Sequence, residues 1–383
     1  MKKVIPYGRQ NITEADIAAV VETLKSDFLT QGPKVKEFED AFAEYVGAKY
    51  AVAVTNATAG LHIAVLALGA KPGKKIITSP ITFIASANCG LYSDMDVDFV
   101  DIDPKTLCID PVLLEEKIKK SPGDYTGVVL VDFAGFPADL EKIKAITEKY
   151  GLWLLEDAAH APGAEYKDSK GQWQKCGNGI HATASVFSFH PVKHIACGEG
   201  GMITTNHEAV YKKLMNLRTH GITRDPAEFV NDSHGGWYYE QIDLGFNYRL
   251  SDVLCSLGIS QLSRMKENIH SRRDIADRYF QGLKSLPITL PHVPETSRHA
   301  YHLFVIQTDR RRELYDHLKS RGIYAQIHYL PVHKQPYYES RYGKQTFPLS
   351  EKYYDRCLSL PMYHSLTQED QKYVIDTIQE FYG

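Results

Sequence analysis

Seven short apolar segments alternate with amphipathic stretches between about residue 50 and residue 206, and no other feature of the sequence constrains the fold as strongly. The apolar segments have the length of strands, and the stretches between them can form helices. This alternation predicts a parallel or mixed sheet covered by helices on both faces. The predicted strands are residues 50–55, 75–78, 97–102, 127–132, 152–156, 184–188 and 201–205. Ligands of such sheets bind at the carboxyl ends of the strands, so polar residues that follow these segments are candidates for a site.

The pattern changes beyond residue 250. Residues 251–286 indicate a long, partly amphipathic helical region that Pro287 interrupts or follows. Strands at 301–306 and 324–328 and helices near 310–321 and 368–382 are predicted after it. We therefore expect an α/β chain with a large mixed-sheet domain over residues 1–250 and a smaller α+β domain over residues 251–383.

Residues 218–245 lie between these two parts and are polar, with weak periodicity. They predict a long ordered loop. Loops of this length in compact enzymes are often functional, and a solvated excursion is the structural alternative.

The composition excludes several classes of protein. A hydrophobic content of 43% over 383 residues supports a sizeable core, and a net charge of -3 provides no general field for nucleic acid. The first residues lack the apolar stretch of a signal peptide, and no segment approaches the roughly 18 apolar residues of a membrane span. The six cysteines form no Cys-x-x-Cys pair and indicate reduced thiols. We expect a cytoplasmic protein without a metal, a membrane or a nucleic-acid partner.

Two of the predicted strands end in reactive side chains. Lys193 follows one of them, shortly after Ser188, whereas Asp157 and His160 follow another. An amine in a polar turn beyond an apolar strand can be kept neutral and can form a Schiff base. The set indicates a pyridoxal phosphate site, in which the carboxylate holds the pyridine nitrogen protonated, the hydroxyl binds the phosphate and the lysine binds the aldehyde carbon.

The helix predicted over residues 58–68 adds a place for the phosphate. Thr58 is a suitable N-cap, and the free backbone N–H groups of the first turn favour an anion. Beyond Lys193, the run from Gly198 to Gly201 allows the backbone to pass closely beside a ligand or another chain. A tight hairpin is the structural alternative for that run.

Each of these residues also has an alternative interpretation. Asp157 alone would be a helix cap or a turn residue, Lys193 alone a surface lysine, and His160 is equally natural as a hydrogen-bonded histidine at a helix start. His190 and His194 flank the lysine and raise the option of a metal site. They lack acidic or cysteine partners at ligand spacing, which disfavours that option.

With these residues placed, the chain resembles the DegT/DnrJ/EryC1 family of sugar aminotransferases over nearly its whole length. The motifs that carry the resemblance are Thr-Gln-Gly at 30–32, Asn-Ala-Thr at 56–58, Thr-Phe at 82–83, Glu-Asp-Ala-Ala-His at 156–160, Ser-Phe-His-Pro-Val-Lys at 188–193, Gly-Glu-Gly-Gly at 198–201 and Gly-Phe-Asn-Tyr-Arg-Leu-Ser-Asp at 245–252. The resemblance implies the fold-type I, aspartate aminotransferase-like architecture of pyridoxal phosphate enzymes. Two positions depart from many relatives, which have glycine in place of Ala57 and glutamine in place of His160.

The resemblance also implies roles for individual residues. Lys193 would carry the cofactor as a Schiff base and shuttle protons, and Asp157 would pair with the pyridine nitrogen. The remaining cofactor contacts would come from the backbone of Thr58 and Ala59 and from Ser188 on the phosphate, Phe83 on the ring, His160 on the phenolic oxygen, and Asn247 on the phosphate of the neighbouring subunit's cofactor. The contact of Asn247 with the neighbouring subunit's cofactor implies a homodimer with shared active sites.

Within the family, residues 190–193, 218–224, 325–333 and 335–338 most resemble the aminotransferases of the pseudaminic acid pathway. That branch implies L-glutamate as amino donor and UDP-2-acetamido-2,6-dideoxy-beta-L-arabino-hexos-4-ulose as acceptor. The residues that would line the sugar-nucleotide pocket are Tyr7, Leu29, Thr30, Gln31, Gly32, Gln326, Ile327, His328 and Tyr329.

Three alternatives to that function remain. One is an aminotransferase for another UDP- or dTDP-linked keto sugar. Another is a pyridoxal phosphate-dependent sugar dehydratase, which characteristically has histidine in place of Lys193 and is therefore disfavoured. The third is a non-catalytic regulatory homologue, which need not retain Asp157, Ser188 and Lys193 together.

Overall fold

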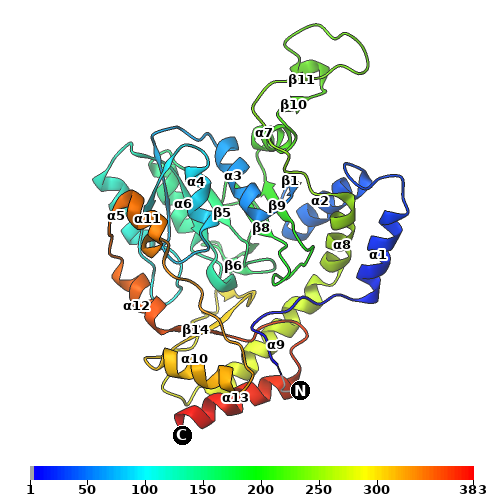
Figure 1. Cartoon of the computed structure of the whole chain (residues 1–383). Helices are drawn as coiled ribbons and strands as arrows, with labels where there is room; N and C mark the ends of the chain where they lie inside the picture. Colours follow the sequence, from blue (N-terminus) through cyan, green and yellow to red (C-terminus); the bar gives the residue numbers. More distant parts are fainter. Residues whose placement is uncertain (1–3) are drawn as a thin grey trace.

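A seven-stranded mixed sheet forms the centre of the protein, whose computed structural model describes residues 4–383 (Figure 1). The strands lie in the order β1-β9-β8-β5-β4-β2-β3. They are β1 (Tyr50–Val54), β2 (Lys75–Thr78), β3 (Asp96–Phe99), β4 (Tyr125–Val131), β5 (Trp153–Asp157), β8 (Ala184–Ser188) and β9 (Gly201–Thr205). Strand β9 is antiparallel to both of its neighbours, and the pairs from β8 to β3 are parallel. The predicted α/β class with a mixed sheet is confirmed.

Alternating side chains of these strands enter two separate cores, one on each face of the sheet. In β4, for example, Val128 and Leu130 pack on one face and Val129 packs on the other. One core is completed by α2 (Pro33–Val46), α5 (Pro111–Lys120), α6 (Leu140–Lys149) and α8 (Asp252–Ser263), and the other by α3 (Ala57–Ala67), α4 (Ala85–Leu91) and α7 (Glu208–Arg218). Because side chains of a strand point alternately to its two sides, apolar residues at nearly every position require helices on both faces.

A smaller C-terminal region has its own core beneath the sheet in Figure 1. Its main elements are α9 (Met265–Leu283), β13 (Phe304–Gln307), α10 (Arg311–Ser320), β14 (Cys357–Leu360) and α13 (Gln368–Tyr382). The helical region predicted over residues 251–286 divides at Arg264 into α8 and α9, and α8 packs against the N-terminal helices rather than in this core. The strand predicted over residues 324–328 is wrong, since only Gln326 forms a single bridge, to Ser359. The boundary at residue 250 stays a prediction.

The remaining elements are short or peripheral. They are α1 (Glu14–Leu24), η1 (Phe133–Gly135), β6 (Glu165–Lys167), β7 (Trp173–Lys175), β12 (Ser297–Arg298), η3 (Val332–Lys334), α11 (Pro336–Tyr342) and α12 (Pro348–Arg356). Within residues 4–383, no helix is long and apolar enough to cross a membrane.

The polar stretch predicted as a long loop forms an arm that projects from the body of the protein after α7 (Figure 1). It contains β10 (Ile222–Thr223), η2 (Pro226–Glu228) and β11 (Glu240–Gln241). Several apolar side chains on it are exposed, among them Val230 at 82%, Trp237 at 75% and Leu244 at 75%. A large aromatic side chain with that exposure favours contact with another protein surface.

Two buried acidic side chains meet near the carboxyl ends of β4 and β5. Asp132 accepts a hydrogen bond from the amide of Ala138, and Glu156 accepts one from Ser185. The remaining oxygen of each carboxyl group, Asp132 Oδ2 and Glu156 Oε1, has no hydrogen-bond partner among residues 4–383. Burial, followed by the charge of Glu156, raises the pKa of Asp132 well above its usual range. Asp132 therefore holds a proton that the two carboxyl groups share.

Asp132→Asn tests this shared proton, because the amide keeps both an acceptor for Ala138 and a donor for Glu156. We expect D132N to retain the free energy of unfolding near neutral pH to within about 1 kcal/mol, as measured by urea unfolding. A raised folded-state pKa means that stability is lost as pH rises above the unfolded-state pKa of about 3.9, so D132N should lose less stability than the wild type as pH rises from about 4. D132A, which leaves Ala138 and Glu156 unpaired, should lose about 2 kcal/mol or more. Equal losses in D132N and D132A would contradict the shared proton.

Candidate active site

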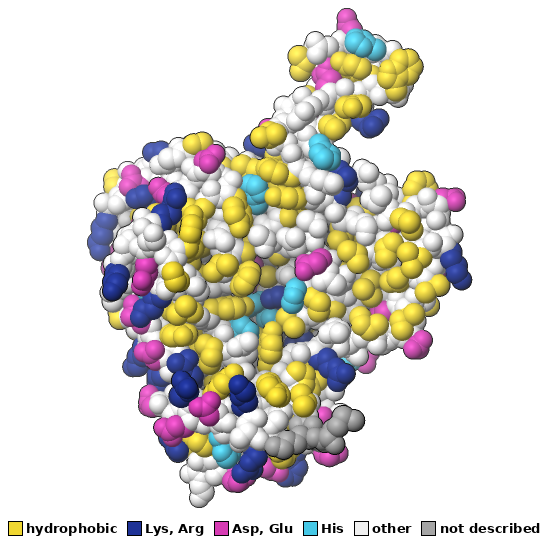
Figure 2. All heavy atoms as spheres, viewed as in Figure 1, with side chains coloured by type: hydrophobic (Ala, Val, Ile, Leu, Met, Phe, Trp, Pro, Cys, Tyr) yellow, Lys and Arg dark blue, Asp and Glu magenta, His cyan; other side chains and the backbone are white. Residues whose placement is uncertain are grey.

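A cavity of about 620 Å³ opens at the carboxyl ends of the parallel strands. Figure 2 shows basic side-chain atoms (Lys or Arg, dark blue) and histidine atoms inside a hollow near the centre of the molecule, with hydrophobic side chains around it. Nine of the residues predicted for the site line the cavity, namely Tyr7, Thr58, Phe83, Asp157, His160, Ser188, Lys193, His328 and Tyr329. They come from the ends of β5 and β8, the start of α3, the loop before α4 and two chain segments outside the sheet, so the fold gathers them from most of the chain.

Asp157 is the last residue of β5 and is buried at the wall of this cavity. Its Oδ2 atom accepts a hydrogen bond from Ser86 Oγ at 2.6 Å, and its Oδ1 atom accepts one from the amide of Ala159 at 3.1 Å. Burial raises the pKa of Asp157, while these two hydrogen bonds and the charge of Lys193 oppose that rise. A cationic ligand group would compensate this buried carboxylate.

Ser86 is a site residue that the sequence analysis missed. It lies in α4 and also shares a hydrogen bond of 2.6 Å with Thr82 Oγ1. A serine within a short helix carries no local signal of function. Only the packing of α4 against the sheet shows that its hydroxyl orients Asp157.

Lys193 lies in the turn after β8, and its amine is buried in the same cavity. Burial lowers the pKa of Lys193 to about 7, helped by the charge of Arg272 and opposed by Asp157. Its Nζ atom lies 3.3 Å from Nε2 of His302. A lysine with that pKa supplies a neutral, nucleophilic amine near neutral pH, as a Schiff base requires.

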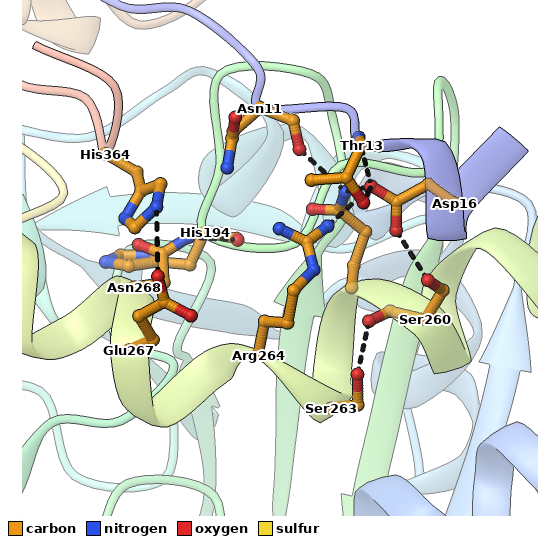
Figure 3. A network of polar contacts seen from close by, with 11 residues as sticks. Asn11, Thr13, Asp16, His194, Ser260, Ser263, Arg264, Glu267, Asn268 and His364 are labelled. Carbon is orange, nitrogen blue, oxygen red and sulfur yellow. Dashed lines mark hydrogen bonds and ion pairs between the residues drawn. The ribbon is translucent and has the colours of Figure 1, made fainter.

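Helix α9 holds the turn that carries Lys193. Asn268 donates from Nδ2 to the carbonyl oxygen of His194 at 2.9 Å, and Arg272 donates from Nε to Asn268 Oδ1 at 2.9 Å. In Figure 3, Asn268 and His194 lie next to the network in which Arg264 pairs with Asp16 of α1. These contacts connect the lysine turn and the N-terminal helix to the same pair of helices.

His160 presents a defined ring nitrogen to the cavity. Its Nδ1 atom accepts a hydrogen bond from the amide of Ala134 at 3.2 Å, so the ring proton is on Nε2, which lies 3.3 Å from the hydroxyl of Tyr329. Burial, followed by the charge of Lys193, lowers the pKa of His160 well below its usual value. His160 is therefore a neutral hydrogen-bond donor at the cavity.

The start of α3 offers a place for an anion, with one correction to the expected cap. The N-cap is Asn56 rather than Thr58, because the Asn56 side chain accepts the amide of Ala59 at 2.8 Å. That amide is already bonded, and the phosphate contact expected for Ala59 stays a prediction. Gly201 of β9 permits the close approach here, since a Cβ atom on it would lie 2.8 Å from the nitrogen of Ala57.

The other predicted site residues do not line this cavity. Thr30 bridges to Ser251, and the Asp252 carboxylate accepts the amide of Gly32 at 2.7 Å. Asn247 bridges to Thr219 at the base of the arm. The segment Leu29–Gly32 thus lies beside residues 245–252, a range that includes Asn247. The exposed residues of this group are Leu29, Thr30, Gln31 and Asn247. Gln326 and Ile327 pack beside β14 and leave only His328 and Tyr329 of their segment at the cavity.

The residues at the cavity fit a phosphorylated aromatic aldehyde. The buried carboxylate of Asp157 suits a protonated ring nitrogen, and the amine of Lys193 suits the aldehyde. Phe83, exposed at 55%, offers an apolar face for a ring, while Thr58 and the hydroxyl of Ser188 lie at the helix start that favours a phosphate.

The family model of the DegT/DnrJ/EryC1/StrS aminotransferases matches residues 10–379. This chain belongs to that family. The SpsC spore coat polysaccharide biosynthesis protein of Bacillus subtilis is 38% identical over 386 residues, which cover 98% of this chain and 96% of that protein. The UDP-4-amino-4,6-dideoxy-N-acetyl-beta-L-altrosamine transaminase of Campylobacter jejuni strain 81-176 is 36% identical over 381 residues, which cover 98% and 96% of the two chains.

Solved structures of aminotransferases have the same architecture. Helicobacter pylori PseC, an aminotransferase involved in the biosynthesis of pseudoaminic acid, matches with a TM-score of 0.90 at 29% identity, over 99% of both chains. The PLP form of Streptococcus pneumoniae Spr1654, a putative sugar aminotransferase, matches with a TM-score of 0.89 at 27% identity, over 99% of this chain and 98% of that one. The expected aspartate aminotransferase-like fold and the sugar aminotransferase class are confirmed, and the family is PLP-dependent.

Ser86→Ala removes the hydroxyl that donates to Asp157. We expect S86A to raise the pKa of Asp157 further and to weaken the binding of pyridoxal phosphate about 10-fold, since hydrogen bonds to charged groups contribute about 1.5 kcal/mol or more. The dissociation constant can be measured by quenching of tryptophan fluorescence. Ser93→Ala is the matched control, because the Ser93 hydroxyl donates to the carbonyl of Cys89 and to no other group within residues 4–383. Equal affinities of S86A and S93A for the cofactor would contradict the role of Ser86.

Proposed function

We propose that this protein binds pyridoxal phosphate and transfers an amino group from L-glutamate to C4 of a nucleotide-linked 4-keto-6-deoxy sugar. The observation that carries the proposal is a buried lysine with a pKa of about 7 in one cavity with a buried aspartate. The lysine also disfavours a sugar dehydratase, because the dehydratases characteristically have histidine at that position. Pyridoxal phosphate, when bound, supplies an aldehyde that exchanges amino groups and a ring that accepts the electron pair released at carbon.

The side chains around the cavity would bind and orient that cofactor. Asp157, oriented by Ser86, would keep the ring nitrogen protonated. The hydroxyl of Ser188 would bind the phosphate at the start of α3, and Phe83 would cover the ring. His160 would donate from Nε2 to the phenolic oxygen, since the amide of Ala134 fixes its tautomer.

Lys193 would move protons during both halves of the reaction. Its neutral amine can take the proton from the α carbon of glutamate and later deliver one to C4 of the sugar. A positioned general acid-base group typically contributes on the order of 10² to 10⁴ in rate. The buried wall formed by His160, His302 and Tyr329 would limit the access of water to these steps.

The acceptor that we propose is UDP-2-acetamido-2,6-dideoxy-beta-L-arabino-hexos-4-ulose. The name of the Campylobacter jejuni relative and the pseudoaminic acid role of the Helicobacter pylori structure support this sugar. A second candidate is another nucleotide-linked keto sugar of polysaccharide synthesis, which is favoured by the 38% identity to the spore coat protein SpsC. Tyr7, His328 and Tyr329 at the cavity would contact the sugar in either case.

The active form that we propose is a homodimer with shared active sites. Asn247 and residues 29–31 are exposed beside residues 245–252 instead of lining the cavity of their own chain. A second subunit placed against this edge would receive them at its own cofactor and sugar. The exposed Trp237 and Leu244 of the arm would be covered in the same interface.

The acceptor is tested by incubating the protein with L-glutamate and candidate UDP-4-keto sugars. We expect formation of the 4-amino-4,6-dideoxy-N-acetyl-beta-L-altrosamine nucleotide, identified by mass spectrometry and NMR. Lys193→Ala should abolish turnover while the cofactor still binds noncovalently, because Asp157 and Ser188 remain. Reaction of D-configured sugars alone would contradict the proposed acceptor, and full activity of K193A would contradict the mechanism.

Shared sites are tested by mixing two inactive variants, K193A and N247A. In a hybrid dimer, the Lys193 of one chain meets the Asn247 of the other, so one of the two sites is intact. Random exchange of subunits makes half of the dimers hybrids, and we expect recovery of about a quarter of the wild-type activity. A mixture as inactive as its parents, although subunit exchange is shown by mass spectrometry, would contradict the shared site.

A further inference from the structure

His302 comes from the C-terminal region and reaches the amine of Lys193. It lies just before β13, lines the cavity and is buried. Its Nε2 atom is 3.3 Å from Lys193 Nζ, and within residues 4–383 no other hydrogen bond is made by that amine. The ring centroids of His302 and His160 are 4.3 Å apart, so the two imidazoles pack together beside the lysine.

The backbone around His302 is fixed from two sides. Arg272 donates from Nη1 to the carbonyl oxygens of Tyr301 at 3.0 Å and His302 at 3.4 Å. On the other side, the amide of Leu303 donates to the carbonyl of Ala134 at 3.1 Å. Gly135, with φ of +96°, follows Ala134 at this point of the chain. A Cβ atom on Gly135 would lie 2.7 Å from the carbonyl oxygen of His160, so glycine allows the backbone segments to pass this closely. The distance between His302 and Lys193 is therefore set by packing.

The environment of His302 selects one tautomer of its ring. The Nδ1 atom is buried and has no hydrogen-bond partner among residues 4–383. An unpaired buried N–H is rarer than an unpaired acceptor, so the proton belongs on Nε2, which faces Lys193. The neighbouring His194 shows the same arrangement, because its Nε2 donates to the carbonyl of Ala300 at 2.9 Å and its Nδ1 has no partner.

We propose that His302 is a positioning residue that donates its Nε2 proton to the lone pair of a neutral Lys193 amine and thereby disfavours the ammonium form. An ammonium group has three N–H donors and no lone pair. It would face the imidazole N–H of His302 unless the ring proton moved to Nδ1, where no acceptor lies within hydrogen-bond distance. The role deepens the proposed function, since it assigns to a named residue the state of the amine that the reaction requires.

Other groups around Lys193 also shift the balance between its neutral amine and its ammonium form. Asp157 favours the ammonium form, and Arg272 opposes it. Burial lowers the pKa values of His160, His194, His302 and His328, so these four imidazoles are neutral. The hydrogen bond from His302 thus acts together with burial and with Arg272 against the pull of Asp157.

His302→Gln tests the proposal, because a glutamine amide can turn its oxygen toward an ammonium group. We expect the pKa of the Lys193 amine to rise by about one unit in H302Q, comparable to the cost of leaving one buried donor unpaired. The amine pKa is read from the full chain freed of cofactor, as the pH dependence of the rate at which acetic anhydride labels Lys193, measured by peptide mass spectrometry. An unchanged or lowered pKa in H302Q would overturn the proposal.

Two control variants separate the hydrogen bond from general disturbance. His299→Gln removes a buried imidazole of the same segment whose Nδ1 accepts the amide of Tyr301, and it should leave the pKa of Lys193 in place. His302→Leu removes the donor to the neutral amine without offering an acceptor to an ammonium group, so it should raise the pKa of Lys193 by less than H302Q does. A rise in H302L or H299Q equal to that in H302Q would overturn the proposal, since solvent entry would then explain the shift.

The tautomer can also be read without a variant. We expect ¹⁵N NMR of the labelled wild-type chain to place the His302 proton on Nε2, and a proton on Nδ1 would overturn the proposal. None of these measurements requires turnover. Failure of every keto sugar to react would contradict the proposed function and leave the amine pKa measurements valid.

Discussion

The proposed active site depends on the burial of an amine and a carboxylate in one cavity at the carboxyl ends of the parallel strands. Lys193 and Asp157 both lose the hydration that would make each of them an ordinary surface charge. The protein compensates them differently. Burial raises the pKa of Asp157 and donors from Ser86 and Ala159 oppose that rise, whereas burial and the nearby Arg272 lower the pKa of Lys193 to about 7. A site of this kind requires a rigid surrounding, which the sheet with a core on each face provides.

Strands, and the residues that directly follow them, can be predicted from the sequence because short contiguous segments encode them. All seven strands of the central sheet were placed, and the positions of Asp157, Ser188 and Lys193 followed because each comes at the end of such a strand. The strand predicted over residues 324–328 failed because this segment meets β14 at a single bridge, from Gln326 to Ser359, instead of pairing along a ladder. Thr58 was expected as a cap because threonine is a common N-cap residue, but the Asn56 side chain is the one that accepts the amide of Ala59.

Residues that act through distant packing could not be predicted. Ser86 reaches Asp157 across 71 positions of sequence, and His302 reaches Lys193 across 109. Neither lies in a motif whose chemistry is visible locally, since a serine in a helix and a histidine near a strand are common. Arg272 is a similar case, because its position in an amphipathic helix gives no sign that its guanidinium is buried on backbone carbonyls.

The origin of His302 in the C-terminal region has a consequence for the protein during its synthesis. A nascent chain that has emerged only as far as β9 already carries Lys193, but neither His302 nor Arg272 has yet been made. Until they arrive, the amine remains hydrated and keeps the ordinary basicity of lysine, with a pKa of about 10.4, so it stays protonated in the cell. Completion of the last third of the chain therefore supplies the buried surroundings and the charge of Arg272 that lower the pKa of this amine.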